Sequence, residues 1–129
     1  MKILVIEDDE NTLHGLRELL SFENYDVATA ATGSEARESF VRTMPDIVLC
    51  DYRLPDTNGI EVCRDFLKQR KTLPIVMVTA YSKAEILHKA KELGIRRIFA
   101  KPIPLDDLFL ELDNIKRDYN LVDQEASTI

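Results

Sequence analysis

The sequence predicts an α/β fold: a doubly wound, five-stranded parallel sheet with five helices in a three-layer α/β/α sandwich. Three short apolar runs, at residues 3–6, 47–50 and 75–78, carry this prediction. Runs that lack polar alternation and are rich in β-branched residues are typical of strands buried on both faces of a parallel sheet. Helical patterns fill the gaps between them, and this alternation favours one sheet with right-handed crossovers.

Along the chain, each predicted strand is followed by a predicted helix. Residues 25–29 alternate in polarity, as an edge strand does, and residues 97–100 form a short, mixed strand. Capping boxes at residues 32–35 and 82–85 indicate two helix starts, and Gly94 indicates a helix end. In chain order, the helical stripes are Leu13, Leu16 and Leu20; Ala36, Phe40 and Val41; Ile60, Cys63, Phe66 and Leu67; Ile86, Leu87, Ala90 and Leu93; and Leu105, Leu108, Phe109 and Leu112.

Length and composition predict one domain with a substantial core. The chain has 129 residues, of which 45% are hydrophobic. A domain of this size buries about two-thirds of the surface that its unfolded chain exposes, so it does not need disulfides to be stable. We expect residues 1–119 to form the domain, and residues 120–129 to be a C-terminal tail or the start of a linker.

The charge balance and the cysteines argue against several classes of protein. With 17 basic and 23 acidic side chains, the net charge is −6, which disfavours direct nucleic-acid binding because phosphate contacts need a surplus of Lys and Arg. No apolar run reaches the roughly 18 residues that span a membrane, and the opening run stops too soon for a signal peptide. Cys50 and Cys63 make no disulfide framework or metal cluster. We expect two reduced thiols in a cytoplasmic protein.

The chemistry is predicted at the carboxyl ends of the strands, where open α/β sheets bind their ligands. Glu7 and Asp8 follow the first strand, and Asp51 follows the third. Thr79 follows the fourth strand and Lys101 follows the fifth. Their joint placement brings carboxylates, a hydroxyl and an ammonium group to one rim of the sheet.

The acidic residues at this rim predict a metal site. Glu7, Asp8 and Asp51 would repel one another at close range, and a divalent cation relieves the repulsion. Oxygen ligands without a nearby His or Cys favour Mg²⁺ over zinc, so Mg²⁺ is the expected cofactor. Asp9 is as well explained by a solvated charge or a helix N-cap as by a place in the site.

The same rim predicts how phosphate would be handled. A phosphate cradle needs Gly, Ser or Thr donors after the first strand, and acidic residues stand there instead. A phosphoryl group must therefore arrive through the metal and be held by Lys101 and Thr79. This arrangement suggests a carboxylate acting as nucleophile, and hence an acyl-phosphate route.

Four motifs, each at a strand end and in chain order, resemble the receiver domain of response regulators in two-component signalling, including the chemotaxis regulators. They are Glu7-Asp8, the segment DYRLPDTNG at residues 51–59, Thr79-Ala80 and Lys101-Pro102. The resemblance covers residues 1 to about 117. It implies the flavodoxin-like strand order 2-1-3-4-5, and a phosphorylation-activated switch rather than an enzyme that turns over a substrate.

The resemblance also implies a role for each acidic residue. Asp51 would accept the phosphoryl group, and the donor would be a phosphohistidine on a sensor histidine kinase or a phosphotransfer protein. Asp8 and Asp51 would bind Mg²⁺ directly, and Glu7 would bind it through water. The main-chain carbonyl of Arg53 would complete the protein ligands.

The remaining site residues include one departure from the family. Lys101 would pair with a phosphoryl oxygen, and its bond to Pro102 would be cis. Thr79 would turn inward to hydrogen-bond the phosphoryl group. Receivers often place Tyr or Phe three residues before the lysine, but Ile98 stands there, and the neighbouring Phe99 faces the other side of the strand. The usual threonine–aromatic switch is therefore not expected in its ordinary form.

Two residues near the site have alternative interpretations, and so does the surface through which the domain would pass its signal. Tyr81 and Arg53 would either gate water access to the phosphoryl group or be exposed loop side chains. The resemblance implies output through the fourth helix–fifth strand–fifth helix face, toward a partner protein, an effector domain or a phosphorylation-dependent homodimer.

Two other functions remain alternatives. One is a small metal-dependent phosphohydrolase with an aspartyl-phosphate intermediate, although residues 7–12 lack the hydrophobic-Asp-x-Asp-x-Thr register of such enzymes. The other is a receiver-like interaction domain that takes no phosphate, for which Ile98 leaves some room. His14 and His88 lie in helical segments and are interpreted as exposed residues rather than phosphotransfer groups.

Overall fold

Five strands and five helices alternate along residues 1–81 and 83–119, which the computed structural model describes. They are β1 (Lys2–Ile6), α1 (Glu10–Phe22), β2 (Asp26–Ala30), α2 (Gly33–Thr43), β3 (Ile47–Asp51), α3 (Gly59–Gln69), β4 (Ile75–Thr79), α4 (Ala84–Leu93), β5 (Arg97–Ala100) and α5 (Leu105–Asp118). The strands form one parallel sheet in the order β2-β1-β3-β4-β5. The predicted doubly wound fold is confirmed. The expected tail, residues 120–129, lies outside the described residues.

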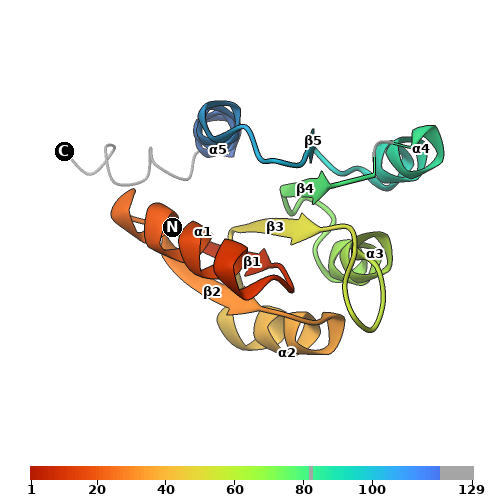
Figure 1. Cartoon of the computed structure of the whole chain (residues 1–129), viewed down its shortest axis with the longest axis horizontal. Helices are drawn as coiled ribbons and strands as arrows, with labels where there is room; N and C mark the ends of the chain where they lie inside the picture. Colours follow the sequence, from red (N-terminus) through yellow and green to blue (C-terminus); the bar gives the residue numbers. More distant parts are fainter. Residues whose placement is uncertain (82, 120–129) are drawn as a thin grey trace.

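Helices cover both faces of the sheet. Figure 1 shows α1 and α5 on one face and α2, α3 and α4 on the other. Alternate residues of β1 point to opposite cores: Ile3 and Val5 pack with α1 and α5, whereas Leu4 and Ile6 pack with α2 and α3. Every residue of β3 and β4 is buried. The apolar runs are therefore two-sided strands, as their composition predicted.

Two predicted helix starts have different outcomes. The Thr32 hydroxyl accepts a hydrogen bond from the N–H of Glu35 at 3.0 Å, which confirms an N-cap there. Helix α4 begins at Ala84, and its N-cap residue is Lys83, which makes no side-chain capping bond. The prediction of a capping box that begins at residue 82 placed this helix start one residue too early, and Ser82 itself lies outside the described residues.

Three residues of the predicted apolar stripes lie at the surface. Val41 is 67% exposed, Leu87 is 41% exposed and Leu105 is 43% exposed. Val41 and Leu87 each directly follow a residue that packs inward, and one residue turns an α-helix by about 100°. The second strand also begins at Asp26 rather than residue 25, because the N–H of Tyr25 bonds the carbonyl of Leu20 at the end of α1.

Candidate functional site

The predicted acidic residues meet at the carboxyl ends of β1 and β3. These strands are neighbours, with Ile6 paired to Cys50, so the residues that follow them come side by side. Ligand oxygens of Glu7, Asp8 and Asp51 all lie within 4.8 Å of one another. Glu7 is 1% exposed and Asp51 is 4% exposed, whereas Asp8 is exposed. Within residues 1–81 and 83–119, this is the one group of three such side chains with metal-ligand spacing.

Lys101 provides the counter-charge to the two buried carboxylates. Its Nζ donates to Oδ2 of Asp51 at 2.7 Å and to Oε1 of Glu7 at 2.8 Å. Burial acts to lower the pKa of Lys101, but the hydrogen bonds and charges of Asp51 and Glu7 outweigh it, so this pKa is raised. The ammonium therefore stays charged at neutral pH. The Lys101–Pro102 peptide bond is cis, as the resemblance implied.

Backbone groups hold the carboxylates in place from the adjoining loops. The N–H of Arg53 donates to Oδ1 of Asp51 at 3.3 Å, and the N–H of Asp9 donates to Oε2 of Glu7 at 3.1 Å. Asp9 itself is the N-cap of α1, because its carboxylate accepts from the hydroxyl and N–H of Thr12 at 2.6 and 3.0 Å. These two bonds hold the pKa of Asp9 below its usual value. The N-cap interpretation of Asp9 is thus confirmed.

Thr79 lies at the same rim but bonds within its own loop. Its side chain is buried, and its hydroxyl accepts from the N–H of Tyr81 at 2.9 Å and donates to the carbonyl of Tyr81 at 3.2 Å. The guanidinium of Arg53 lies 4.7 Å from the centre of the Tyr81 ring. This cation–π contact joins the β3–α3 loop to the β4–α4 loop beside Asp51.

The two candidate switch residues on β5 face opposite cores. Ile98 is half-buried and packs against the core beneath α2, α3 and α4. Phe99 is 4% exposed in the core beneath α1 and α5, and the guanidinium of Arg97 lies 4.7 Å from its ring centre. The expected orientation of Phe99 is confirmed, so its ring cannot move in behind Thr79 from the same face as Ile98.

The side chains of the rim suit a hard cation. Three carboxylates face a single ammonium group, which leaves negative charge in excess. The potential ligands are all oxygens, and hard divalent cations prefer such ligands to nitrogen or sulfur. Glu7 and Asp51 have little solvent around them to relieve this excess of charge. The residues present therefore fit a divalent metal ion.

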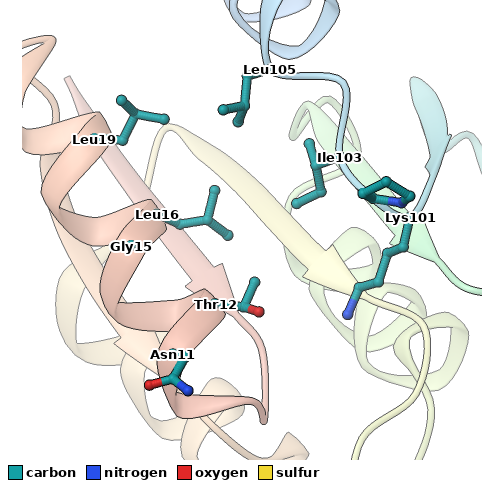
Figure 2. Close-up of a pocket in the computed structure, with 9 residues that line it drawn as sticks. Asn11, Thr12, Gly15, Leu16, Leu19, Lys101, Ile103 and Leu105 are labelled. Atoms are coloured by element: carbon teal, nitrogen blue, oxygen red, sulfur yellow. The ribbon is translucent and has the colours of Figure 1, made fainter.

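An apolar groove borders the site and was not predicted. It has a volume of about 380 Å³ and lies between α1 and the segment that joins β5 to α5 (Figure 2). Its lining residues are Asn11, Thr12, Gly15, Leu16, Leu19, Lys101, Pro102, Ile103 and Leu105. Lys101 belongs both to this groove and to the acidic rim. The available sequence signal was Gly15 in the middle of a predicted helix. Glycine destabilises a helix interior, so its presence there indicates a role in packing or function.

The histidines and cysteines lie away from the acidic rim or within the core. His14 and His88 lie at exposed sites, paired with Glu18 at 3.1 Å and Glu92 at 2.8 Å. Cys50 and Cys63 are buried free thiols. A hydrogen bond with Cys63 and burial raise the pKa of the Cys50 thiol, as expected for a thiol in apolar surroundings. In the part of the chain that the structure describes, no helix has the length and apolar character needed to cross a membrane.

The parallel sheet in this order, with a buried acid held by a lysine beside two more acids, defines a receiver-type α/β domain. The family model of the response regulator receiver domain matches residues 3–113. The chain belongs to this family. Receiver domains are the phosphoacceptor modules of two-component signalling.

The chain is similar in sequence to a response regulator and to a sporulation phosphotransferase. It is 32% identical to the response regulator MprA of Mycobacterium ulcerans over 127 residues, which cover 98% of this chain and 55% of MprA. It is 31% identical to the sporulation initiation phosphotransferase F of Bacillus subtilis over 107 residues, 83% of this chain and 86% of that protein. The chain thus spans only about half of MprA but most of the Bacillus protein.

Two solved receiver domains have closely similar folds. The non-phosphorylated HemR receiver domain of Leptospira biflexa gives a TM-score of 0.83 at 34% identity, covering 88% of this chain and 92% of that one. The BeF3-activated N-terminal receiver domain of Klebsiella pneumoniae RstA gives a TM-score of 0.82 at 30% identity, covering 91% and 99%. The similarity extends over nearly the whole of each domain.

Proposed function

We propose that this chain is a phosphorylation-controlled receiver module in which Asp51 accepts a phosphoryl group from a phosphohistidine on a sensor kinase or phosphotransfer protein. The observation that carries the proposal is the environment of Asp51 at the end of β3. Asp51 is 4% exposed, and its carboxylate is bound by Lys101 at 2.7 Å and lies beside Glu7 and Asp8. Family membership supports phosphorylation-activated signalling, and this geometry supports the choice of acceptor.

Mg²⁺ is the cofactor that we propose for the acidic rim. Asp8 and Asp51 would bind it directly, Glu7 would bind it through water, and the carbonyl of Arg53 would add a backbone ligand. The spacing of the three carboxylates within 4.8 Å supports this set of ligands. When bound, Mg²⁺ neutralises negative charge on the carboxylates and on the phosphoryl oxygens.

The proposed transfer is a displacement at phosphorus. One oxygen of Asp51 forms the new O–P bond, while the N–P bond of the phosphohistidine breaks and its electron pair stays on the imidazole nitrogen. The Lys101 ammonium, already bonded to Asp51, is in position to stabilise charge on the phosphoryl oxygens. Thr79 would exchange its bonds to the Tyr81 backbone for a bond to the phosphoryl group. The protein thereby catalyses only its own phosphorylation and dephosphorylation.

The proposal is tested by incubating the protein with acetyl phosphate or beryllofluoride, with and without Mg²⁺. Intact mass spectrometry reports the added phosphoryl group, and NMR reports the change at the rim. We expect a change that requires Mg²⁺. If neither reagent produces an Mg²⁺-dependent change in the wild-type protein, the proposed function is wrong.

The groove between α1 and the β5–α5 segment is the proposed docking site for the phosphohistidine donor. It is largely apolar, and Lys101 is among its lining residues (Figure 2). The same lysine bonds Glu7 and Asp51 of the acidic rim. A helix that carries the phosphohistidine would pack its apolar side against Leu16 and Ile103 and bring its imidazole to Asp51. Gly15 supports this use, because a Cβ built at that position meets no atom within 4 Å and the space above it is open.

Substitution of Gly15 should separate docking from chemistry. We expect Gly15→Phe to slow phosphotransfer from a phosphorylated histidine donor at least about tenfold, because the ring occupies the groove. Phosphorylation by acetyl phosphate, which needs no docking surface, should stay unchanged. Gly15→Ala is the control: it should stabilise α1 by about 0.5–1 kcal/mol and leave both reactions close to wild type. Equal slowing of both reactions by Gly15→Phe would contradict the docking role.

Arg53 and Tyr81 are proposed to restrict water access to the acyl phosphate. Their cation–π contact spans the two loops beside Asp51. We expect Tyr81→Ala to shorten the lifetime of the phosphorylated state by about two- to fivefold, the range that corresponds to an exposed cation–π contact. Lys116→Ala, which removes a similar contact over Tyr25 before β2, should leave the lifetime unchanged. A lifetime in Tyr81→Ala equal to or longer than that of the wild type would exclude the gate.

Several further assignments complete the proposal. We take residues 1–119 as the receiver domain, residues 120–129 as a tail or the start of a linker, and the cytoplasm as its location.

Output would pass through the α4–β5–α5 face to a partner, an effector domain or a second phosphorylated copy. On this face Arg96 pairs with Glu111 and Asp118, and Arg97 lies 3.6 Å from Glu111. A charged network that joins β5 to α5 would transmit a shift of either element to the surface.

A further inference from the structure

The loop between β3 and α3 is fastened to the start of α2 by one side chain, Asp56. Its Oδ1 accepts a hydrogen bond from the N–H of Gly33 at 2.8 Å, and its Oδ2 accepts from the N–H of Ser34 at 3.0 Å. Both N–H groups belong to the first turn of α2, where backbone donors have no partner within the helix. The positive end of the helix dipole also favours a carboxylate there. Asp56 therefore ties two elements that are distant in the sequence.

The loop that Asp56 holds is short and closed on itself. Arg53 and Asn58 form an antiparallel bridge, and the N–H of Leu54 donates to the carbonyl of Thr57 at 3.3 Å. Asp56 lies at the tip of this hairpin, and Arg53 lies at its base. A displacement of the tip is thus passed to the backbone of Arg53.

Gly33 makes the close contact between the loop and α2 possible. A Cβ built on Gly33 would lie 2.4 Å from Cγ2 of Thr57 and 3.2 Å from Oδ1 of Asp56. The first distance is far below van der Waals contact, so any side chain at this position would push the loop away from the helix. The fit between loop and helix is specified from both sides, by a carboxylate on the loop and by a missing side chain on the helix.

The contact between Asp56 and α2 persists at neutral pH, and a neighbouring ion pair of α2 provides a control for it. The hydrogen bond from the N–H of Gly33 outweighs the opposing effect of desolvation and, together with the bond from Ser34, holds the pKa of Asp56 below its usual value. The carboxylate is therefore ionised over the range in which the protein works. Arg37 on α2 pairs separately with Asp65 on α3 at 2.9 Å. That ion pair also anchors α2 and makes no direct bond to the loop after β3, although the charge of Arg37 also helps to lower the pKa of Asp56.

We infer that Asp56 is a positioning residue for the cation site: by fixing the loop on α2, it sets the position of the Arg53 carbonyl. The inference rests on the proposed function, in which that carbonyl is a Mg²⁺ ligand. Asp56 acts through Arg53, whose N–H also bonds Asp51 at 3.3 Å. Asp56→Asn keeps the shape of the side chain but has one oxygen, so it can satisfy only one of the two N–H groups. We expect Mg²⁺ affinity to fall about tenfold, the low end for loss of a group that supports a metal ligand.

The test is an NMR titration of the full chain with MgCl₂ and no phosphodonor, which measures cation binding apart from activity. Asp56→Asn and Gly33→Ala break the same contact from opposite sides, and both should bind Mg²⁺ about tenfold more weakly than the wild type. Asp65→Asn removes the same charge from the other anchor of α2 and should bind like the wild type. Phosphorylation by acetyl phosphate should need more Mg²⁺ in the first two variants but reach the wild-type rate at saturation.

The outcomes of these measurements distinguish a failure of the inference from a failure of the proposed function. Wild-type affinity in both Asp56→Asn and Gly33→Ala would overturn the inference, and so would a reduced saturating rate with an unchanged Mg²⁺ midpoint. Equal weakening in Asp65→Asn would also overturn it, because the effect would then belong to α2 in general. Absence of any Mg²⁺-induced shift in the wild type would instead contradict the proposed function itself. Because Gly33→Ala leaves Asp56 intact, a folding defect confined to Asp56→Asn still leaves the inference testable.

Discussion

Asp51→Asn is expected to abolish phosphorylation while preserving the fold. The amide matches the carboxylate in size, and the Lys101 ammonium keeps its bond to Glu7 at 2.8 Å. An amide oxygen, however, carries no full negative charge and cannot form a stable acyl phosphate. We therefore expect no added phosphoryl group by intact mass after incubation with Mg²⁺ and acetyl phosphate, under conditions that modify the wild type. The effect is the largest we predict, because it removes the nucleophile.

The matched control for Asp51→Asn is Asp46→Asn. Asp46 lies just before β3, and its carboxylate bonds the N–H of Lys2 at 2.9 Å at the amino-terminal edge of the sheet. This variant should take up phosphoryl groups like the wild type. Phosphorylation of Asp51→Asn to the wild-type extent would show that the acceptor lies elsewhere. Continuous release of phosphate from a small ester by the wild type would favour the phosphohydrolase alternative instead.

The sequence predicted the sheet well because its central strands are buried on both faces. The central runs in β1, β3 and β4 leave little choice of structure, since four consecutive apolar residues pack into the cores on both faces of the sheet. The two weaker strand signals had different outcomes: residues 97–100 form β5 as predicted, whereas the edge strand was misplaced by one residue. Tyr25 has a buried side chain, yet its N–H completes the end of α1, so the strand begins one residue later than the polarity pattern predicted.

The composition of the rim was also predictable, whereas its internal bonding was not. Parallel strands end at one edge, so the residues after β1, β3, β4 and β5 had to gather there. Which partner each side chain chooses depends on loop conformation. Thr79 bonds the backbone of Tyr81, and Asp56 reaches across to α2. The Asp56 contact has no pattern in the local sequence, because residues 33 and 56 meet only after the chain has folded.

Lys101→Met is expected to weaken the fold and to make its stability depend more strongly on Mg²⁺. Glu7 and Asp51 are almost completely buried and share the Lys101 ammonium. Removal of one partner from a buried ion pair costs about 3–5 kcal/mol. The Lys101 side chain is 27% exposed, so solvent screens part of the charge, and we expect a loss of about 2 kcal/mol in the free energy of unfolding.

Urea unfolding in EDTA and in MgCl₂ measures this effect directly. In EDTA, Lys101→Met leaves two buried carboxylates without their counter-charge and should be destabilised. Bound Mg²⁺ supplies positive charge at the same place, so it should stabilise the variant more than it stabilises the wild type. Lys89→Met, which removes an exposed pair with Glu85 at 3.4 Å, should lie within about 0.5 kcal/mol of the wild type. If Lys101→Met is as stable as the wild type in EDTA, the ammonium does not balance the buried acids. The charge argument for a cation at this rim would then lose its main support.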